Sequence, residues 1–350
     1  KRLTDRYDAV TVPDYLEARF RDHGHRLRLL SAAALVVFVT IYVSAQIDAT
    51  GKAFESFLSW DYYVGASFGF VVVLAYITTG GFLAVAWSDV FQGALMFFGL
   101  VLLPIVGLIA AGGWGPVAEG LAAQDPALLA PLGAEGATVI GVAGVISLAL
   151  IGLGFLGSPQ IFVRFIALRD ESEIPRGATV AIVWTILADS GAVLIGLVGR
   201  HMLTGDLGSG GESVLPMLVE HLMPAFLVGL YIAIVLSAIM STADSLLVLA
   251  ASAAVRDVYQ QVLHPETPDD ALVPMSRKAT LGLALVAFAI SMGVAISTPD
   301  RTIFWFVIFG WSGIAATFCP VLILSLFWRG ITARGAAVAM ITGFLAVPLF

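Results

Sequence analysis

The stretch LSAIMSTADSLLVLAASAAVRD, residues 236–257, places hydroxyl side chains and a carboxylate in a segment that is otherwise apolar enough to span a bilayer. A charged group near the bilayer centre costs roughly 2.5–3.5 kcal/mol on insertion scales, so we expect Asp244 to face a cavity, a partner or an ion. Spacings of three and four gather oxygens on one helical stripe, formed by Ala238, Ser241, Thr242 and Ser245. Such neutral oxygens suit a small monovalent cation. The alternative is that the hydroxyls only pack and hydrogen-bond neighbouring helices.

The composition of the whole chain is that of a polytopic membrane protein. Of its 350 residues, 59% are hydrophobic and 12% are charged, whereas a soluble chain carries roughly 25% charged residues. The single cysteine, Cys319, excludes an internal disulfide framework and a cysteine-ligated metal site. The net charge of -7 says nothing about nucleic acid, because the basic residues fall in short loops, where they report membrane topology, and no nucleic-acid partner is expected.

Apolar stretches of the length that crosses a bilayer, about 20 residues, predict nine membrane spans. They cover residues 29–49, 60–86, 89–112, 138–157, 177–199, 222–253, 279–297, 302–328 and 335–350. We therefore expect an all-α membrane domain over residues 29–350, preceded by a basic amphipathic segment over residues 1–28. In that segment Pro13 is expected to open a helix with Tyr15, Leu16 and Phe20 on one side, lying on the membrane surface.

The distribution of basic residues predicts the topology, since Lys and Arg collect in cytoplasmic connections. Fifteen of the eighteen Lys and Arg residues fall in one set of alternate connections, and the other set holds only Lys52, Arg200 and Arg301. The amino-terminal end is therefore predicted to be cytoplasmic in a multi-pass protein of the cell membrane. The Gly- and Ala-rich connection 112–138 is then predicted to be an external loop.

The fourth span, GVISLALIGLGFLGSPQIFVRF over residues 144–165, is interrupted by Gly152, Gly154, Gly157 and Pro159. A broken membrane helix frees backbone groups that transporters use to hold ions and solutes. The alternative is a simple kink where another helix packs closely. The sequence contains no nucleotide-binding loop, HExxH zinc motif or GxSxG elbow, so an enzyme is not indicated.

Several stretches resemble the sodium/solute symporter family, most closely its sodium/proline symporter branch. They are VPDYLEARF (12–20), TIYVSAQIDATGKAFE (40–55), GGFLAVAWSDVFQGALMFFGL (80–100), LSAIMSTADSLLVLAASAAVRDVY (236–259) and the tail from residue 309 to residue 343. The resemblance implies a LeuT-like core of ten helices in two inverted five-helix repeats. The spans here correspond to core helices 3–10 and one accessory helix. Because core helices 1 and 2 are missing and the sequence begins without Met, we expect a fragment of a longer protein.

The resemblance also implies where Na+, the coupling ion, binds. The main sodium site falls on the Ala238 carbonyl and the hydroxyls of Ser241 and Thr242. A second cation region of some relatives falls on Asp89, Ser241, Asp244 and Ser245. For Asp89, expected at the start of the third span, two roles stay open: a carboxylate that favours the helix dipole, or a cation relay toward the cytoplasm. Asp244 is either a ligand or only an acceptor of hydrogen bonds.

For the solute, the resemblance implies pocket positions at Tyr42 and Pro159. The Trp and Tyr that relatives carry on the broken helix align with Ile151 and Phe155 here, which removes polar anchors for a carboxylate or amine. Asp189, in WTILADSGAVLIG, adds an intramembrane carboxylate that is a site hypothesis by default. Its alternative role is a hydrogen bond to a neighbouring helix.

These observations predict sodium-coupled uptake of a small organic solute: proline, another amino acid or a related compound. The expected partners are the solute, sodium and the lipid bilayer. Two alternatives remain, a membrane solute sensor of the same fold and a proton-coupled transporter that uses Asp189 or Asp244.

Overall fold

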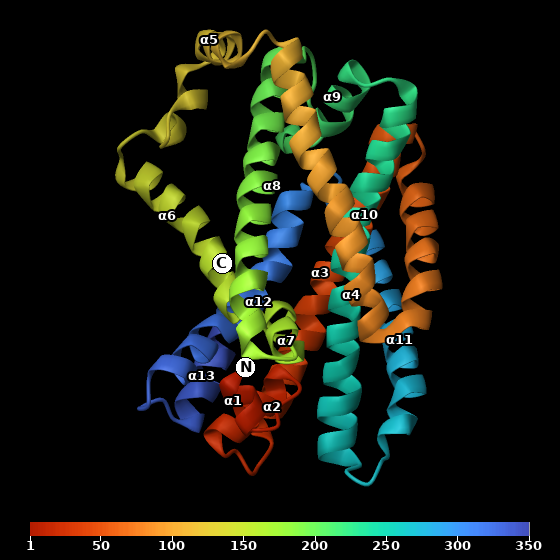
Figure 1. Ribbon diagram of the computed structural model, residues 1–350, viewed down its shortest axis with the longest axis vertical. Helices are drawn as coiled ribbons and strands as arrows, with labels where there is room; N and C mark the ends of the chain where they lie inside the picture. The colour runs from red at the N-terminus through yellow and green to blue at the C-terminus, as the bar shows by residue number, and fades with distance from the viewer. Residues whose placement is uncertain (350) are drawn as a thin grey trace.

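The computed structural model describes residues 1–349, except for the side chains of residues 76 and 78–84. The described residues form helices and connecting turns (Figure 1). The α-helices are α1 (Arg2–Arg6), α2 (Val12–Phe20), α3 (Arg26–Leu58), α4 (Tyr62–Ala110), α5 (Trp114–Gln124), α6 (Val139–Leu153), α7 (Pro159–Ala167), α8 (Ile174–Met202), α9 (Val214–Leu222), α10 (Ala225–Ser252), α11 (Asp269–Ser297), α12 (Ile303–Phe327) and α13 (Ala333–Ala346). A π-helix, η6 (Ala253–Leu263), continues α10, and short 3-10 turns fill several connections.

The nine predicted apolar stretches all fall on helices. Seven described helical segments are long and apolar enough to cross a membrane, and two shorter apolar ones, Tyr62–Ala75 and Ala333–Leu349, account for the others. The second and third predicted spans both lie in α4, an element of 49 residues, and correspond to its apolar segments Tyr62–Ala75 and Val85–Ala110. A straight helix of that length would extend about 74 Å, far more than a bilayer. Figure 1 shows the two ends of α4 running in different directions.

The centre of the bundle is α3, which packs along α4, α10, α11 and α12. Leu35, Phe38 and Val39 of α3 are buried in one apolar cluster with Leu246 of α10 and Phe318 of α12. Glycine permits the closest approach: a Cβ at Gly313 of α12 would collide with the ring of Phe38, so α12 lies directly against α3. This packing places the polar positions of α3, α10 and α12 inside the protein.

Two connections contain helices that the sequence did not predict. The predicted external loop 112–138 contains α5, whose Val117 and Leu121 are fully buried. The connection between α8 and α10 contains α9, whose Leu218 and Val219 are also fully buried. These side chains complete a second apolar cluster with Leu103 of α4. Figure 1 shows α5 and α9 at the upper end of the bundle and α1 and α2 at its lower end.

The segment 1–28 forms α1 and α2, and Pro13 lies in the first turn of α2 as predicted. A capping box between Thr11 and Asp14 starts this helix, since each side chain accepts a hydrogen bond from the backbone of the other. The apolar side of α2 packs on the protein: Tyr15 and Leu16 are fully buried. Their side chains therefore face the bundle, whereas Phe20 is only partly buried. Buried Arg28 ties this segment down through ion pairs with Asp14, at 2.6 Å, with Glu17, at 2.7 Å, and with Asp257 of η6, at 2.9 Å.

Candidate functional site

Three oxygens converge on one turn of α10, as the spacing of the sequence predicted. The hydroxyls of Ser241 and Thr242 donate to the Ala238 carbonyl at 3.0 and 3.2 Å. All three residues are partly buried. Both hydroxyls can rotate their protons away, which leaves three neutral oxygens on one turn of the helix. Hard, neutral oxygens at this spacing fit a small monovalent cation, so the residues present suit sodium.

The second cation region is built from three helices. Asp89 of α4 forms an ion pair with Arg164 of α7, with 2.8 Å between Oδ2 and Nη2. Ser245 of α10 accepts a hydrogen bond from Arg164 at 2.9 Å and donates one to Asp89 at 3.4 Å. Asp244 is fully buried on the adjoining face of α10. Asp89 is the fifth residue of the apolar segment Val85–Ala110 within α4, so both roles expected for it stay open.

An aromatic cluster brings four of the predicted solute residues close to the break in the fourth span. Trp311 of α12 lies 6.4 Å from Tyr42 and 4.5 Å from Phe155, measured between ring centroids. Its indole nitrogen donates to the Ile151 carbonyl at 3.4 Å. Pro159 begins α7 directly after the break. Trp311 therefore joins the two sides of the predicted solute site.

The break itself is the 3-10 turn η3, Gly154–Gly157, and small residues allow it to lie against α12. A Cβ at Gly154 would approach Ala315 to 2.8 Å, and one at Gly157 would approach the backbone nitrogen of Cys319 to 2.7 Å. No larger residue fits either position without moving α12. The predicted interruption is thus a real change of helix type, held in place by close packing.

Asp189 does not belong to either group. It lies on the exposed side of α8, while Trp184, Ala188 and Gly191 on the other side face α4. It lines none of the cavities described below. Its predicted role with the solute therefore receives no support from the arrangement of the helices.

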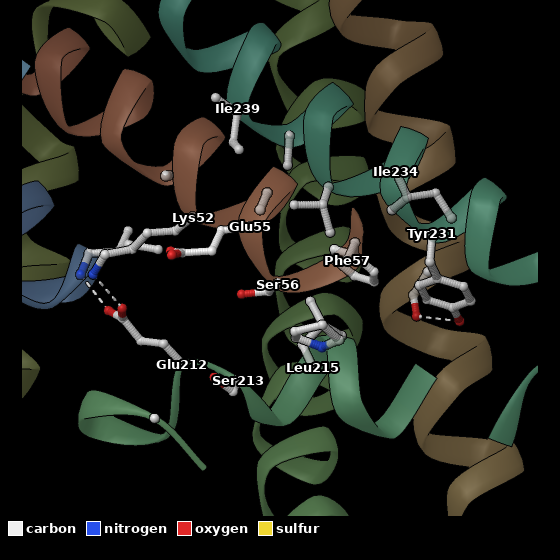
Figure 2. Close-up of a pocket in the computed structure, with 18 of the residues that line it drawn as sticks. Lys52, Glu55, Ser56, Phe57, Glu212, Ser213, Leu215, Tyr231, Ile234 and Ile239 are labelled. Atoms are coloured by element: carbon white, nitrogen blue, oxygen red, sulfur yellow. Dashed lines mark hydrogen bonds and ion pairs between the residues drawn. The ribbon is translucent and has the colours of Figure 1, made fainter. Parts of the chain in front are cut away.

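A cavity of about 480 Å³ lies at the upper end, between α3, α4, α10 and the connection before α9. Lys52 and Ser56 of α3 and Glu212 line it, and Ala238 lies in its wall (Figure 2). Lys52 forms an ion pair with Glu212 at 2.8 Å. The cavity therefore runs from a half-buried charge pair to Ala238, the member of the oxygen cluster that lines it.

Beside this cavity, Asp48 of α3 and Arg301 of the α11–α12 connection form a buried ion pair. Asp48 has no exposed surface, and it accepts a hydrogen bond from the Tyr62 hydroxyl at 2.6 Å. Burial acts to lower the pKa of Arg301, but the hydrogen bond and charge of Asp48 outweigh it and raise that pKa above its ordinary value. Arg301 is therefore a fixed cation that ties the α11–α12 connection to α3.

At the lower end, a second cavity of about 520 Å³ lies between the amino-terminal segment, α7 and α10. Arg164, Ser245 and Asp257 line it. Ser245 of the second cation region, with its partner Arg164, thus lines this cavity, while Ala238 of the main oxygen cluster lines the upper one. The two cavities approach α10 from opposite ends.

Sequence reasoning missed Trp311, Arg164 and the pairs of Lys52 and Arg301. The sequence contained a hint of each. Trp311 belongs to the FGWSG stretch at 309–313, and Arg164 closely follows the break in the fourth span. Lys52 and Arg301 are two of the three basic residues in the set of connections that is poor in Lys and Arg. Their partners lie far away in the sequence, so the signals did not identify the contacts.

Membrane-length helices, a broken helix beside an aromatic cluster and converging oxygens on a facing helix define a secondary transporter. The sequence of residues 1–343 matches the protein family described as "Sodium:solute symporter family". The chain belongs to this family, and it is a transporter and not an enzyme.

Similar proteins carry related descriptions. The high-affinity proline transporter PutP of Bacillus subtilis is 37% identical over 345 residues, which cover 98% of this chain and 71% of the relative. The osmoregulated proline transporter OpuE of the same organism is 34% identical, over 98% and 68%. The sodium/proline symporter of Escherichia coli is 32% identical, over 97% and 67%.

Among solved structures, the substrate-bound outward-open state of a Na+-coupled sialic acid symporter matches with a TM-score of 0.79 at 18% identity. The match covers 100% of this chain and 79% of that one. It confirms the predicted all-α, LeuT-like fold. The family match and the relatives confirm the predicted family and the predicted class of function, sodium-coupled solute uptake.

Proposed function

We propose that this protein uses the inward movement of sodium through the oxygen cluster of α10 to accumulate a small amino acid or related compound. The observation that carries the proposal is that the hydroxyls of Ser241 and Thr242 both lie on the Ala238 carbonyl, at 3.0 and 3.2 Å. In an apolar span, these oxygens now hydrogen-bond to each other within the helix. A desolvated monovalent cation bound there would take the place of those hydrogen bonds. The coupling ion would be sodium, which is named in the description of the Escherichia coli relative.

The solute would lie at the break of the fourth span, beside Trp311, Tyr42 and Phe155. These rings offer an apolar surface, and the Tyr42 hydroxyl offers one polar atom. Ser158 lies at the start of α7 with 1% of its surface exposed, and its hydroxyl has no hydrogen-bond partner among the described residues. A helix start favours negative charge. The site therefore suits a molecule with a carboxylate and a compact apolar body, and proline, named in the relatives' descriptions, is the first to try.

We further propose that the lower end of the bundle faces the cytoplasm. Most of the Lys and Arg residues belong to its connections, as in Arg2, Arg164 and Arg256. The upper cavity then opens outward and the lower cavity inward. Sodium would reach the α10 cluster past Lys52 and Glu212 and would leave past Ser245.

Coupling follows from thermodynamic linkage between the two sites. If sodium at the α10 cluster favours the arrangement that binds solute, each ligand raises the affinity for the other by the same factor. The membrane potential adds about 2.3 kcal/mol per charge for each 100 mV to the driving force. Solute accumulation therefore requires both the oxygens of α10 and an inward sodium gradient.

The test is uptake of labelled amino acids, including proline, into proteoliposomes with and without an inward sodium gradient. Ser241→Ala and Thr242→Ala each remove one ligand and should raise the sodium concentration for half-maximal uptake roughly tenfold, which corresponds to about 1.4 kcal/mol. Ser237→Ala, one position before Ala238 on α10, is the matched control and should leave it unchanged. Uptake that ignores sodium, or equal sodium dependence in all three variants, would refute the proposal.

A further inference from the structure

Arg164 occupies the middle of the second cation region. Its guanidinium lies between the Asp89 carboxylate, at 2.8 Å, and the Ser245 hydroxyl, at 2.9 Å. These are two of the groups that a cation in this region would need as ligands. An arginine side chain remains charged in a protein, so the region already holds one positive charge.

Because Asp89 is largely buried, the positive charge of Arg164 is a suitable partner for its carboxylate. The Asp89 side chain is only 16% exposed, and its other oxygen, Oδ1, is buried without a hydrogen-bond partner among the residues the structure describes. A carboxylate this buried requires a counter-charge, and Arg164 provides one through a charge-assisted hydrogen bond. A sodium ion bound to the same oxygens would lie against the guanidinium and would be repelled by it.

The fold explains how Arg164 reaches this position. The break at η3 ends the fourth span early, and α7 then carries Arg164 in its last turn. The side chain is 46% exposed and borders the lower cavity of about 520 Å³. It therefore extends from the cavity wall toward α10, and it has space to withdraw.

We propose that Arg164 is a tethered cation that takes the place of a second sodium ion at Asp89 and Ser245. The inference rests on the proposed function, because it assumes that a first sodium ion binds at the α10 cluster. Ser245 lies about one helical turn beyond that cluster on α10. The protein therefore binds one sodium ion, and the charge of Asp89 stays balanced by Arg164 without a second one.

The direct test counts sodium ions by equilibrium binding of radioactive 22Na+ to the purified transporter in detergent. The native protein should bind one ion per chain at saturation. Arg164→Gln should bind two, a doubling, because Asp89 then lacks its counter-charge. Arg164→Lys keeps a cation in place and should bind one. Arg164→Gln combined with Asp89→Asn removes both charges and should return to one.

The outcomes separate this inference from the proposed function. Two ions in the native protein would overturn the tethered-cation role of Arg164 without any variant. One ion in Arg164→Gln, with a thermal unfolding transition like that of the native protein, would overturn it as well. No sodium in the native protein would refute the proposed function itself. A second ion that also appears in Arg164→Lys would show that charge is not what excludes it.

Discussion

The ion pair between Asp48 and Arg301 gives a prediction whose size can be worked out from the structure. Asp48→Asn removes the charge that balances Arg301 but preserves the shape of the side chain. The Arg301 side chain is 9% exposed, so water cannot replace the lost carboxylate. Removing one partner of a buried pair costs about 3–5 kcal/mol, because the other charge is left uncompensated.

Two contacts place the cost of Asp48→Asn at the lower end of that range. Arg301 also donates to the carbonyls of Ala295 and Thr298, at 3.5 and 3.2 Å, and these bonds survive the substitution. The Asn side chain still accepts one hydrogen bond, from Arg301 or from Tyr62. We therefore expect a loss of about 3 kcal/mol, which corresponds to a fall in Tm of roughly 5 °C.

The assay is thermal unfolding of the purified protein in detergent, followed by intrinsic fluorescence. Glu55→Gln is the matched control, since it removes a carboxylate charge from the exposed surface of the same helix, and it should leave Tm within about 1 °C. The double variant Asp48→Asn/Arg301→Met should recover part of the loss, because the uncompensated cation is gone. A Tm of Asp48→Asn equal to that of Glu55→Gln would refute the reasoning.

Three further predictions concern packing, the solute and access to the upper cavity. Gly157→Ala would place a Cβ 2.7 Å from a backbone nitrogen of α12 and should abolish uptake, whereas Gly152→Ala, with nothing within 4 Å of its Cβ, should retain it in the same assay. Trp311→Ala removes the ring that contacts both Tyr42 and Phe155, and it should raise the solute KM at least tenfold. The sodium concentration for half-maximal uptake should change less than twofold, and equal effects on both would contradict the assignment of Trp311 to the solute site. Glu212→Gln breaks the ion pair with Lys52 and should speed thiol labelling of a Ser56→Cys variant several-fold, and an unchanged rate would argue against a barrier at that pair.

The sequence predicted the features that depend on neighbouring residues. Spacings of three and four were enough to place Ser241 and Thr242 on the same turn as the Ala238 carbonyl, because helix geometry alone determines that relation. The run of glycines before Pro159 likewise identified the break, since those residues destabilise a helix locally. Apolar length identified the spans.

Features that depend on distant residues were not predicted. Trp311 meets the Ile151 carbonyl across 160 positions of sequence, and Arg164 meets Ser245 across 81. No periodicity relates such pairs, and only packing brings them together. The same limit explains α5: its buried Val117 and Leu121 have the spacing of a helix, but a Gly- and Ala-rich composition concealed it until Val198 and Leu218 supplied the surface it covers.

The position of α3 explains how sodium and solute could influence each other. On one side α3 carries Tyr42 into the aromatic cluster, and Gly310 of α12 lies so close that a Cβ there would be 2.9 Å from the Tyr42 Cα. On another side α3 packs along α10, which carries the oxygen cluster. Packed interiors change between discrete arrangements instead of deforming continuously. A shift of α10 around a bound cation must therefore be taken up at α3, and the tight contact with α12 passes it to the aromatic cluster. This path joins the two sites through one helix and requires no contact between ion and solute.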